Sequence, residues 1–208
     1  LMINNAFFFG DSFTFGHGVE SNQTWAYHIF KFLKAKNFIN LGVNGFSNES
    51  IFNSIIDNFS KIGEKDTVFI LLRKSDWFLF LEKDEFKDFI ISESENPILD
   101  RYWYHYINPY SKTLLKDRDN KFGKFLQKVI PCNSIVINRH DHRRKFETIE
   151  DATNGKIKDT HWSPKGHRDF AHYIIKELLD WLFFLILRYK NKGYAFKNYK
   201  KISWEIFR

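Results

Sequence analysis

The stretch Asn5–Val19, NAFFFGDSFTFGHGV, joins a short aromatic run to a glycine-rich turn. The run from Asn5 to Phe9 is typical of a strand that is buried on both faces of a parallel sheet. Gly10 permits a tight turn directly after this run. Ser12 would then project at the carboxyl end of the strand, where open α/β sheets bind their ligands. The stretch therefore predicts the first strand of an α/β sheet and a hydroxyl group at its binding edge.

Strand-like runs alternate with helical patterns along the rest of the chain. The further strands are predicted at Phe38–Leu41, Thr67–Leu72 and Ser134–Asn138. Helices are predicted at Thr24–Lys36, at Ser47–Phe59 with Ser47 or Asn48 as its cap, and at Pro164–Leu187. This alternation predicts a parallel sheet with helices on both faces. We expect one domain over residues 1–188, with an irregular or helical insertion at 77–130 and a basic aromatic tail at 189–208.

Composition excludes several classes of protein. The chain has 208 residues, of which 43% are hydrophobic and 27% charged, so it is neither disordered nor collagen-like. Its single cysteine, Cys132, excludes an internal disulfide framework and a cysteine-based zinc cage. The first residues lack the basic region of a signal peptide, and the longest apolar run, Trp181–Leu187, is much shorter than the roughly 20 residues of a membrane span. These observations leave the localisation open between the cytoplasm and a viral or cell-surface assembly.

The net charge of +7 is unevenly distributed. Residues 1–100 carry 9 Lys and Arg against 14 Asp and Glu, whereas residues 101–208 carry 23 against 11. The basic tail could meet nucleic acid or another anionic surface, or it could be a solvated or partner-docking extension. No nucleic-acid motif accompanies the charge, so we expect no nucleic acid as a partner. The tail could instead support a homo-oligomer or a larger assembly.

A second block, KDTHWSPKGH (Lys158–His167), directly precedes the last predicted helix. Asp159 could orient the imidazole of His161, whose other nitrogen would act as the base that a serine nucleophile needs. Taken alone, the Gly-Asp-Ser turn could be a helix cap, and Asp-x-His could be a turn with a surface histidine. A third block, NLGVNGFS (Asn40–Ser47), follows the second predicted strand.

Together these blocks resemble, in their order, those of the SGNH (GDSL-type) hydrolase family over roughly residues 5–175. The resemblance implies a flavodoxin-like three-layer α/β/α sandwich and a serine acyl hydrolase or transferase that needs no cofactor. It implies that Ser12 is the nucleophile, His161 the general base and Asp159 the residue that orients the imidazole. The backbone N–H groups of Ser12 and Gly45 would stabilise the oxyanion of the tetrahedral intermediate.

Two blocks differ from the usual pattern of this family. Arg73, Lys74, Ser75 and Asp76 stand where Gly-x-Asn-Asp is usual, so the hydroxyl of Ser75 would replace an asparagine as the third oxyanion donor. The acid lies two residues before His161 instead of three. The sequence Asp-Thr-His-Trp at 159–162 resembles the corresponding block of the alginate O-acetyltransferase branch of the superfamily. This resemblance favours O-acetyl groups on sugars as substrates.

Residues beside these blocks are candidates for binding the substrate, which would be a small-molecule or carbohydrate ester. These candidates are Asp11, His17, Asn44, Arg73, Asp76, His140 and Arg143. The arginines at 139–144 could bind the carboxylate of an acidic sugar, or they could belong to a solvated basic loop. His140, Asp141 and His142 lie next to one another in one predicted loop, and without further ligands they do not predict a metal site.

Three functions follow as hypotheses. The first is a serine esterase that removes a small acyl group, most plausibly acetyl, from a carbohydrate or similar polyol. The second is an O-acyltransferase that uses the same three residues and passes the acyl group to a sugar hydroxyl. The third is a degenerate domain of this type that serves as a structural or carbohydrate-binding module.

Overall fold

The computed structural model describes most of the chain, and its central feature is a five-stranded parallel sheet. The described residues are 2–73, 77–82, 85–90, 108–138, 145–190 and 203–206. The strands of the sheet are β1 (Asn5–Gly10), β2 (Asn37–Gly42), β3 (Thr67–Leu72), β6 (Asn133–Asn138) and β7 (Ser203–Ile206). Their spatial order is β2-β1-β3-β6-β7, which is the flavodoxin-like order.

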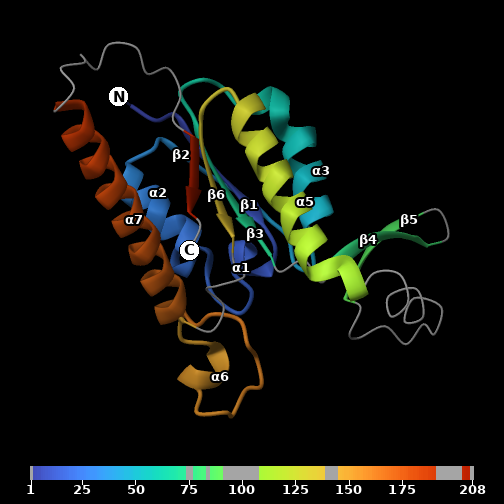
Figure 1. Ribbon diagram of the computed structural model, residues 1–208. Helices are drawn as coiled ribbons and strands as arrows, with labels where there is room; N and C mark the ends of the chain where they lie inside the picture. Colours follow the sequence, from blue (N-terminus) through green and yellow to red (C-terminus); the bar gives the residue numbers. More distant parts are fainter. Residues whose placement is uncertain are drawn as a thin grey trace.

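Helices cover both faces of this sheet (Figure 1). On one face lie α2 (Trp25–Leu33) and α7 (Pro164–Lys190), and on the other lie α3 (Asn48–Asn58) and α5 (Asn108–Val129). The short elements are α1 (Ser12–Phe15), η1 (Ser21–Gln23), η2 (Phe59–Lys61) and α6 (Ile149–Ala152). The expected three-layer α/β/α sandwich is therefore confirmed.

The two faces of the sheet build two separate cores, because successive side chains of a strand point to opposite faces. Phe8 and Phe69 pack with α2 and α7, and their rings stack with centroids 5.0 Å apart. Phe7 and Phe9, which flank Phe8, pack with α3 and α5 on the other face. The continuous aromatic run of β1 thus serves both cores at once.

The starts of α2 and α3 follow from side-chain capping. The Thr24 side chain accepts a hydrogen bond from the backbone N–H of Tyr27, and that of Ser47 accepts one from Ser50. Each cap satisfies a backbone donor that has no partner within its helix. Ser47, one of the two predicted caps, is therefore the N-cap of α3.

The structure shows an antiparallel hairpin where the sequence predicts irregular or helical structure. Its strands are β4 (Trp77–Glu82) and β5 (Glu85–Ile90), which pair with each other and project away from the sandwich (Figure 1). Strand β4 reads Trp-Phe-Leu-Phe-Leu, and a continuous apolar run does not distinguish a strand from a helix. The two intervening residues, Lys83 and Asp84, are not an Asn-Gly or Asp-Gly turn signal.

The end of the chain adds the last strand to the sheet. Ser203–Ile206 lies within the segment expected to be a basic tail, and it pairs in parallel with β6, with Trp204 opposite Ile135. A parallel edge strand of this kind depends on main-chain hydrogen bonds to β6. Among the described helices, none combines the length and apolar character needed to cross a membrane.

Candidate active site

The candidate site lies at the carboxyl edge of the sheet, beside the point where the strand order reverses. Strand β1 lies between β2 and β3 in the sheet. The chain leads from β1 to β2 on one side and from β3 to β6 on the other, so the connections that follow β1 and β3 run in opposite directions. Open α/β sheets bind ligands at this kind of switch point. Ser12 is the first residue of α1, directly after β1, and its side chain is partly exposed there.

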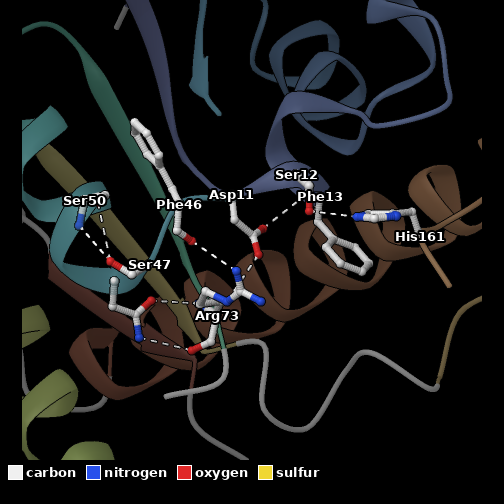
Figure 2. A network of polar contacts seen from close by, with 9 residues as sticks. Asp11, Ser12, Phe13, Phe46, Ser47, Ser50, Arg73 and His161 are labelled. Carbon is white, nitrogen blue, oxygen red and sulfur yellow. Dashed lines mark hydrogen bonds and ion pairs between the residues drawn. The ribbon is translucent and has the colours of Figure 1, made fainter. Parts of the chain in front are cut away.

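A chain of two hydrogen bonds joins Ser12, His161 and Asp159. Nε2 of His161 lies 2.8 Å from Oγ of Ser12, although the two residues are 149 positions apart in the sequence. Nδ1 of His161 lies 2.6 Å from Oδ1 of Asp159. When the imidazole carries its proton on Nδ1, it donates to Asp159 and accepts the serine hydroxyl proton on Nε2. Figure 2 shows the Ser12 and His161 side chains pointing toward each other.

Hydrogen bonds from His161 stabilise the charged form of Asp159. Partial burial by itself would raise the pKa of Asp159, but hydrogen bonds from the backbone N–H and the ring of His161 outweigh it and lower the pKa. The backbone bond is 2.8 Å long and ends on Oδ1, the oxygen that also contacts the ring. The carboxylate is therefore ionised at neutral pH.

His161 is set up to accept a proton at neutral pH. Burial lowers the pKa of His161, and this effect exceeds the opposing influence of the hydrogen bond and charge of Asp159. The pKa therefore lies below the ordinary value of 6.5, and the neutral ring prevails near pH 7. A general base must be neutral before it can take the proton of a hydroxyl group.

Two buried aromatic side chains lock the serine loop to the histidine loop. Phe13 and Trp162, which follow Ser12 and His161 in the sequence, contact each other edge to face with ring centroids 4.7 Å apart. Phe13 also lies against the ring of His161, with centroids 4.9 Å apart. Trp162 is fully buried. The sequence favoured core packing over sugar stacking for Trp162 and predicted no role for Phe13, whose position directly after Ser12 was the available signal.

Arg73 connects three loops beneath the candidate nucleophile (Figure 2). Its Nε lies 3.8 Å from Oδ2 of Asp11, and its Nη1 donates a hydrogen bond of 3.2 Å to the carbonyl of Phe46. The Asn48 side chain bonds both the N–H and the carbonyl of Arg73. Asp11 and Arg73, two predicted substrate-binding residues, are thus buried in a network that ties the ends of β1 and β3 to the start of α3.

The candidate oxyanion donors lie on the turns that follow β1 and β2. Gly45 occupies a turn in which the N–H of Phe46 donates to the carbonyl of Val43, and its φ of 84° favours glycine. Among the described residues, the N–H groups of Ser12 and Gly45 have no hydrogen-bond acceptor. Neither donor is therefore used within the part of the chain that the structure describes.

The remaining predicted residues divide into two groups. His17 lies close to the candidate acid, with its Nε2 3.6 Å from Oδ2 of Asp159 and its ring centroid 4.4 Å from that of His161. Asn44 is exposed on the turn after β2. Ser75, Asp76, His140 and Arg143 lie outside the described residues. The contact between His17 and Asp159 joins residues 142 positions apart, and no local pattern in the sequence predicts it.

The chain is distantly similar to several solved structures. No protein-family model matches the chain, and no curated protein matches its sequence. The solved structure of AlinE4, an SGNH-hydrolase family esterase, is 15% identical over 65% of this chain and 59% of its own, with a TM-score of 0.40. The chain thus spans 59% of the length of AlinE4.

Two further structures are proteins assigned to the lipolytic G-D-S-L family. The one from Desulfitobacterium hafniense DCB-2 is 14% identical over 82% of this chain and 97% of its own, with a TM-score of 0.43. The one from Veillonella parvula DSM 2008 is 12% identical over 84% of this chain and 71% of its own, with a TM-score of 0.37. At such low identities and TM-scores, these similarities carry no weight for the activity of the protein.

Proposed function

We propose that the protein is a serine hydrolase that cleaves small acyl esters. The observation that carries this proposal is the hydrogen-bonded chain from Ser12 through His161 to Asp159, with contacts of 2.8 and 2.6 Å. A serine hydroxyl becomes a useful nucleophile when a neutral imidazole can take its proton, and a carboxylate on the other ring nitrogen fixes the required tautomer. The lowered pKa of His161 supports the neutral state that this role needs.

The reaction would proceed in two halves. Oγ of Ser12 attacks the acyl carbonyl carbon while Nε2 of His161 takes the hydroxyl proton. The resulting oxyanion accepts hydrogen bonds from the N–H groups of Ser12 and Gly45. His161 then gives the proton to the departing alcohol oxygen, which leaves the acyl group on Ser12. Water attacks this acyl-enzyme with His161 again as the base, and the carboxylic acid leaves as the serine regains its proton.

We propose O-acetyl groups on carbohydrate as the substrate class. The support for this choice is the Asp-Thr-His-Trp sequence at 159–162, which resembles the block of O-acetylating enzymes.

In this assignment Asp11 and Arg73 support the nucleophile turn from beneath, because both side chains are buried. His17 is exposed beside the candidate base, where it can contact the alcohol part of the ester.

The test is hydrolysis of p-nitrophenyl acetate by the parent and by Ser12→Ala and His161→Ala. We expect each substitution to lower kcat by about 10⁴-fold or more, the scale seen when a serine nucleophile or its base is removed. Ser60→Ala, at an exposed serine after α3, is the matched control and should keep the parent rate. Equal activity in the parent and Ser12→Ala would overturn the proposal.

A separate experiment distinguishes hydrolysis from transfer. The parent is incubated with p-nitrophenyl acetate and a deacetylated polysaccharide, and both free acetate and new sugar ester are measured. Acetate as the main product supports the hydrolase. Sugar ester that forms in the parent but not in Ser12→Ala would show that a sugar hydroxyl replaces water in the second half-reaction.

A further inference from the structure

Three potential metal ligands converge at the candidate acid. His17, Asp159 and His161 each offer one ligand atom, and these atoms all lie within 4.8 Å of one another. Asp159 is the centre of the group, since Oδ1 contacts His161 and Oδ2 faces Nε2 of His17. Among the described residues, these three form the one group of histidine, cysteine or acidic side chains whose spacing would allow a metal ion to bind.

One separation in this group suits a small transition-metal ion, whereas the 2.6 Å hydrogen bond between Nδ1 of His161 and Oδ1 of Asp159 must lengthen when an ion replaces its proton. Zinc binds imidazole nitrogen and carboxylate oxygen at about 2.0–2.2 Å, so two ligands of a tetrahedral ion lie about 3.4 Å apart. The 3.6 Å between Nε2 of His17 and Oδ2 of Asp159 is close to that separation. The His17 side chain is 45% exposed, which gives an ion access and leaves room for a water ligand. Two imidazoles and one carboxylate favour zinc over magnesium or calcium, which prefer oxygen ligands.

We propose that His17, Asp159 and His161 form a reversible inhibitory site for Zn²⁺. The ion binds Nε2 of His17, the Asp159 carboxylate and Nδ1 of His161. Because the metal takes the Nδ1 position, the single proton of the neutral ring moves to Nε2 by exchange with solvent. Nε2 then donates to Oγ of Ser12 and can no longer accept its proton. The inhibitory effect rests on the proposed hydrolase activity, whereas the binding of the metal does not.

Binding is tested without activity, using the full chain with Ser12→Ala, which keeps all three ligands. We expect isothermal titration to show one Zn²⁺ per chain, and Co²⁺ to give the visible absorption of a nitrogen- and oxygen-ligated ion. Loss of a group that only supports a ligand costs 10–100-fold in metal affinity, so adding His17→Ala should weaken binding by about 100-fold or more. His17→Gln, which keeps a polar side chain, should weaken it similarly.

Two controls separate this site from other histidines. His172→Ala removes an exposed histidine of α7, and the double change His140→Ala with His142→Ala removes the other histidine pair singled out in the sequence. Both should leave the Zn²⁺ affinity unchanged. Absence of Zn²⁺ binding, unchanged affinity in His17→Ala, or loss of affinity in either control would overturn the proposed site.

The inhibitory effect is tested on the parent with p-nitrophenyl acetate. We expect Zn²⁺ to abolish hydrolysis, a chelator to restore it, and Mg²⁺ to have no effect. The Zn²⁺ concentration for half-inhibition should rise about 100-fold in His17→Ala, relative to the metal-free rate of that variant. Full activity with Zn²⁺ bound would overturn the inhibitory role. A parent without hydrolase activity would remove the proposed function but leave the binding result standing.

Discussion

At the scale of single residues, the one carboxylate of Asp159 makes three contacts. Its Oδ1 accepts hydrogen bonds from both the backbone N–H and the ring of His161, so the aspartate fixes the loop conformation and the ring orientation together. Its Oδ2 faces His17. The Asp-x-His spacing makes this possible, because the carboxylate reaches the N–H of the residue two positions later, as in an Asx turn.

We predict that Asp159→Asn lowers kcat for p-nitrophenyl acetate by about 10⁴-fold, the loss known for the same change in a serine protease triad. The amide can donate to Nδ1, which favours the tautomer with the proton on Nε2 and removes the base. Asp57→Asn, at an exposed position of α3, is the control and should retain the parent rate. A rate within tenfold of the parent for Asp159→Asn would show that Asp159 does not orient His161 during the reaction.

At the scale of elements, the nucleophile turn is held in place by close packing of α1 against the end of β2. Gly42, the last residue of β2, has no room for a side chain, because an added Cβ would lie 2.3 Å from the backbone nitrogen of Phe15. The Asn40 side chain adds a hydrogen bond of 2.8 Å to the carbonyl of Thr14. Gly42, which belongs to the Asn40–Ser47 block, therefore helps to position Ser12 by allowing backbone contact with α1.

We predict that Gly42→Ala destabilises the protein by about 1–3 kcal/mol through overpacking. It should also lower kcat, because the displaced backbone carries Ser12 away from His161. Urea unfolding and the p-nitrophenyl acetate assay measure the two effects. Gly63→Ala is the matched control, since the nearest atom to its added Cβ is 3.7 Å away. Equal stability and activity for both variants would contradict the packing argument.

At the scale of the whole molecule, His167 joins the two helices on one face of the sheet. It lies near the start of α7, is fully buried, and accepts a hydrogen bond of 3.3 Å on Nδ1 from the backbone N–H of Trp25, the first residue of α2. Burial lowers the pKa of His167 to about 3, with smaller contributions from the nearby His28 and His161. The fold therefore requires the neutral imidazole.

This burial predicts acid sensitivity of the folded state. In the unfolded chain the histidine takes up a proton near pH 6.5, whereas in the fold it does so only near pH 3. The unfolded state therefore binds more protons between these values, and the stability from His167, fully present above pH 6.5, falls as the pH falls toward 3. The loss is about 1.4 kcal/mol per pH unit at most.

Urea unfolding at several pH values measures this dependence. His167→Asn, which keeps an acceptor near the Nδ1 position, should be less stable at neutral pH but should show a smaller loss of stability between pH 6.5 and 4. His172→Gln, at an exposed position of the same helix, should retain the full dependence of the parent. An unchanged slope in His167→Asn would mean that other groups control the acid sensitivity.

The sequence alone determined the elements whose signals are local. The alternation of apolar runs with helical periodicity predicted β1, β2, β3, β6 and the helices α2, α3 and α7, because burial period, caps and turns are set by residues close in the chain. Motif resemblance brought Ser12, Asp159 and His161 forward as candidates, and their catalytic roles stay predictions.

The tertiary structure decided which distant residues meet. Only packing of the sandwich places His17 beside Asp159, and Arg73 beside Asp11 and Phe46. Packing of the sandwich also brings Phe13 into contact with Trp162, and this contact holds the candidate nucleophile beside its base. The β4–β5 hairpin and the addition of β7 to the sheet edge likewise depend on pairing partners outside their own segments. Local periodicity does not predict such contacts, because they form between segments that lie far apart in the sequence.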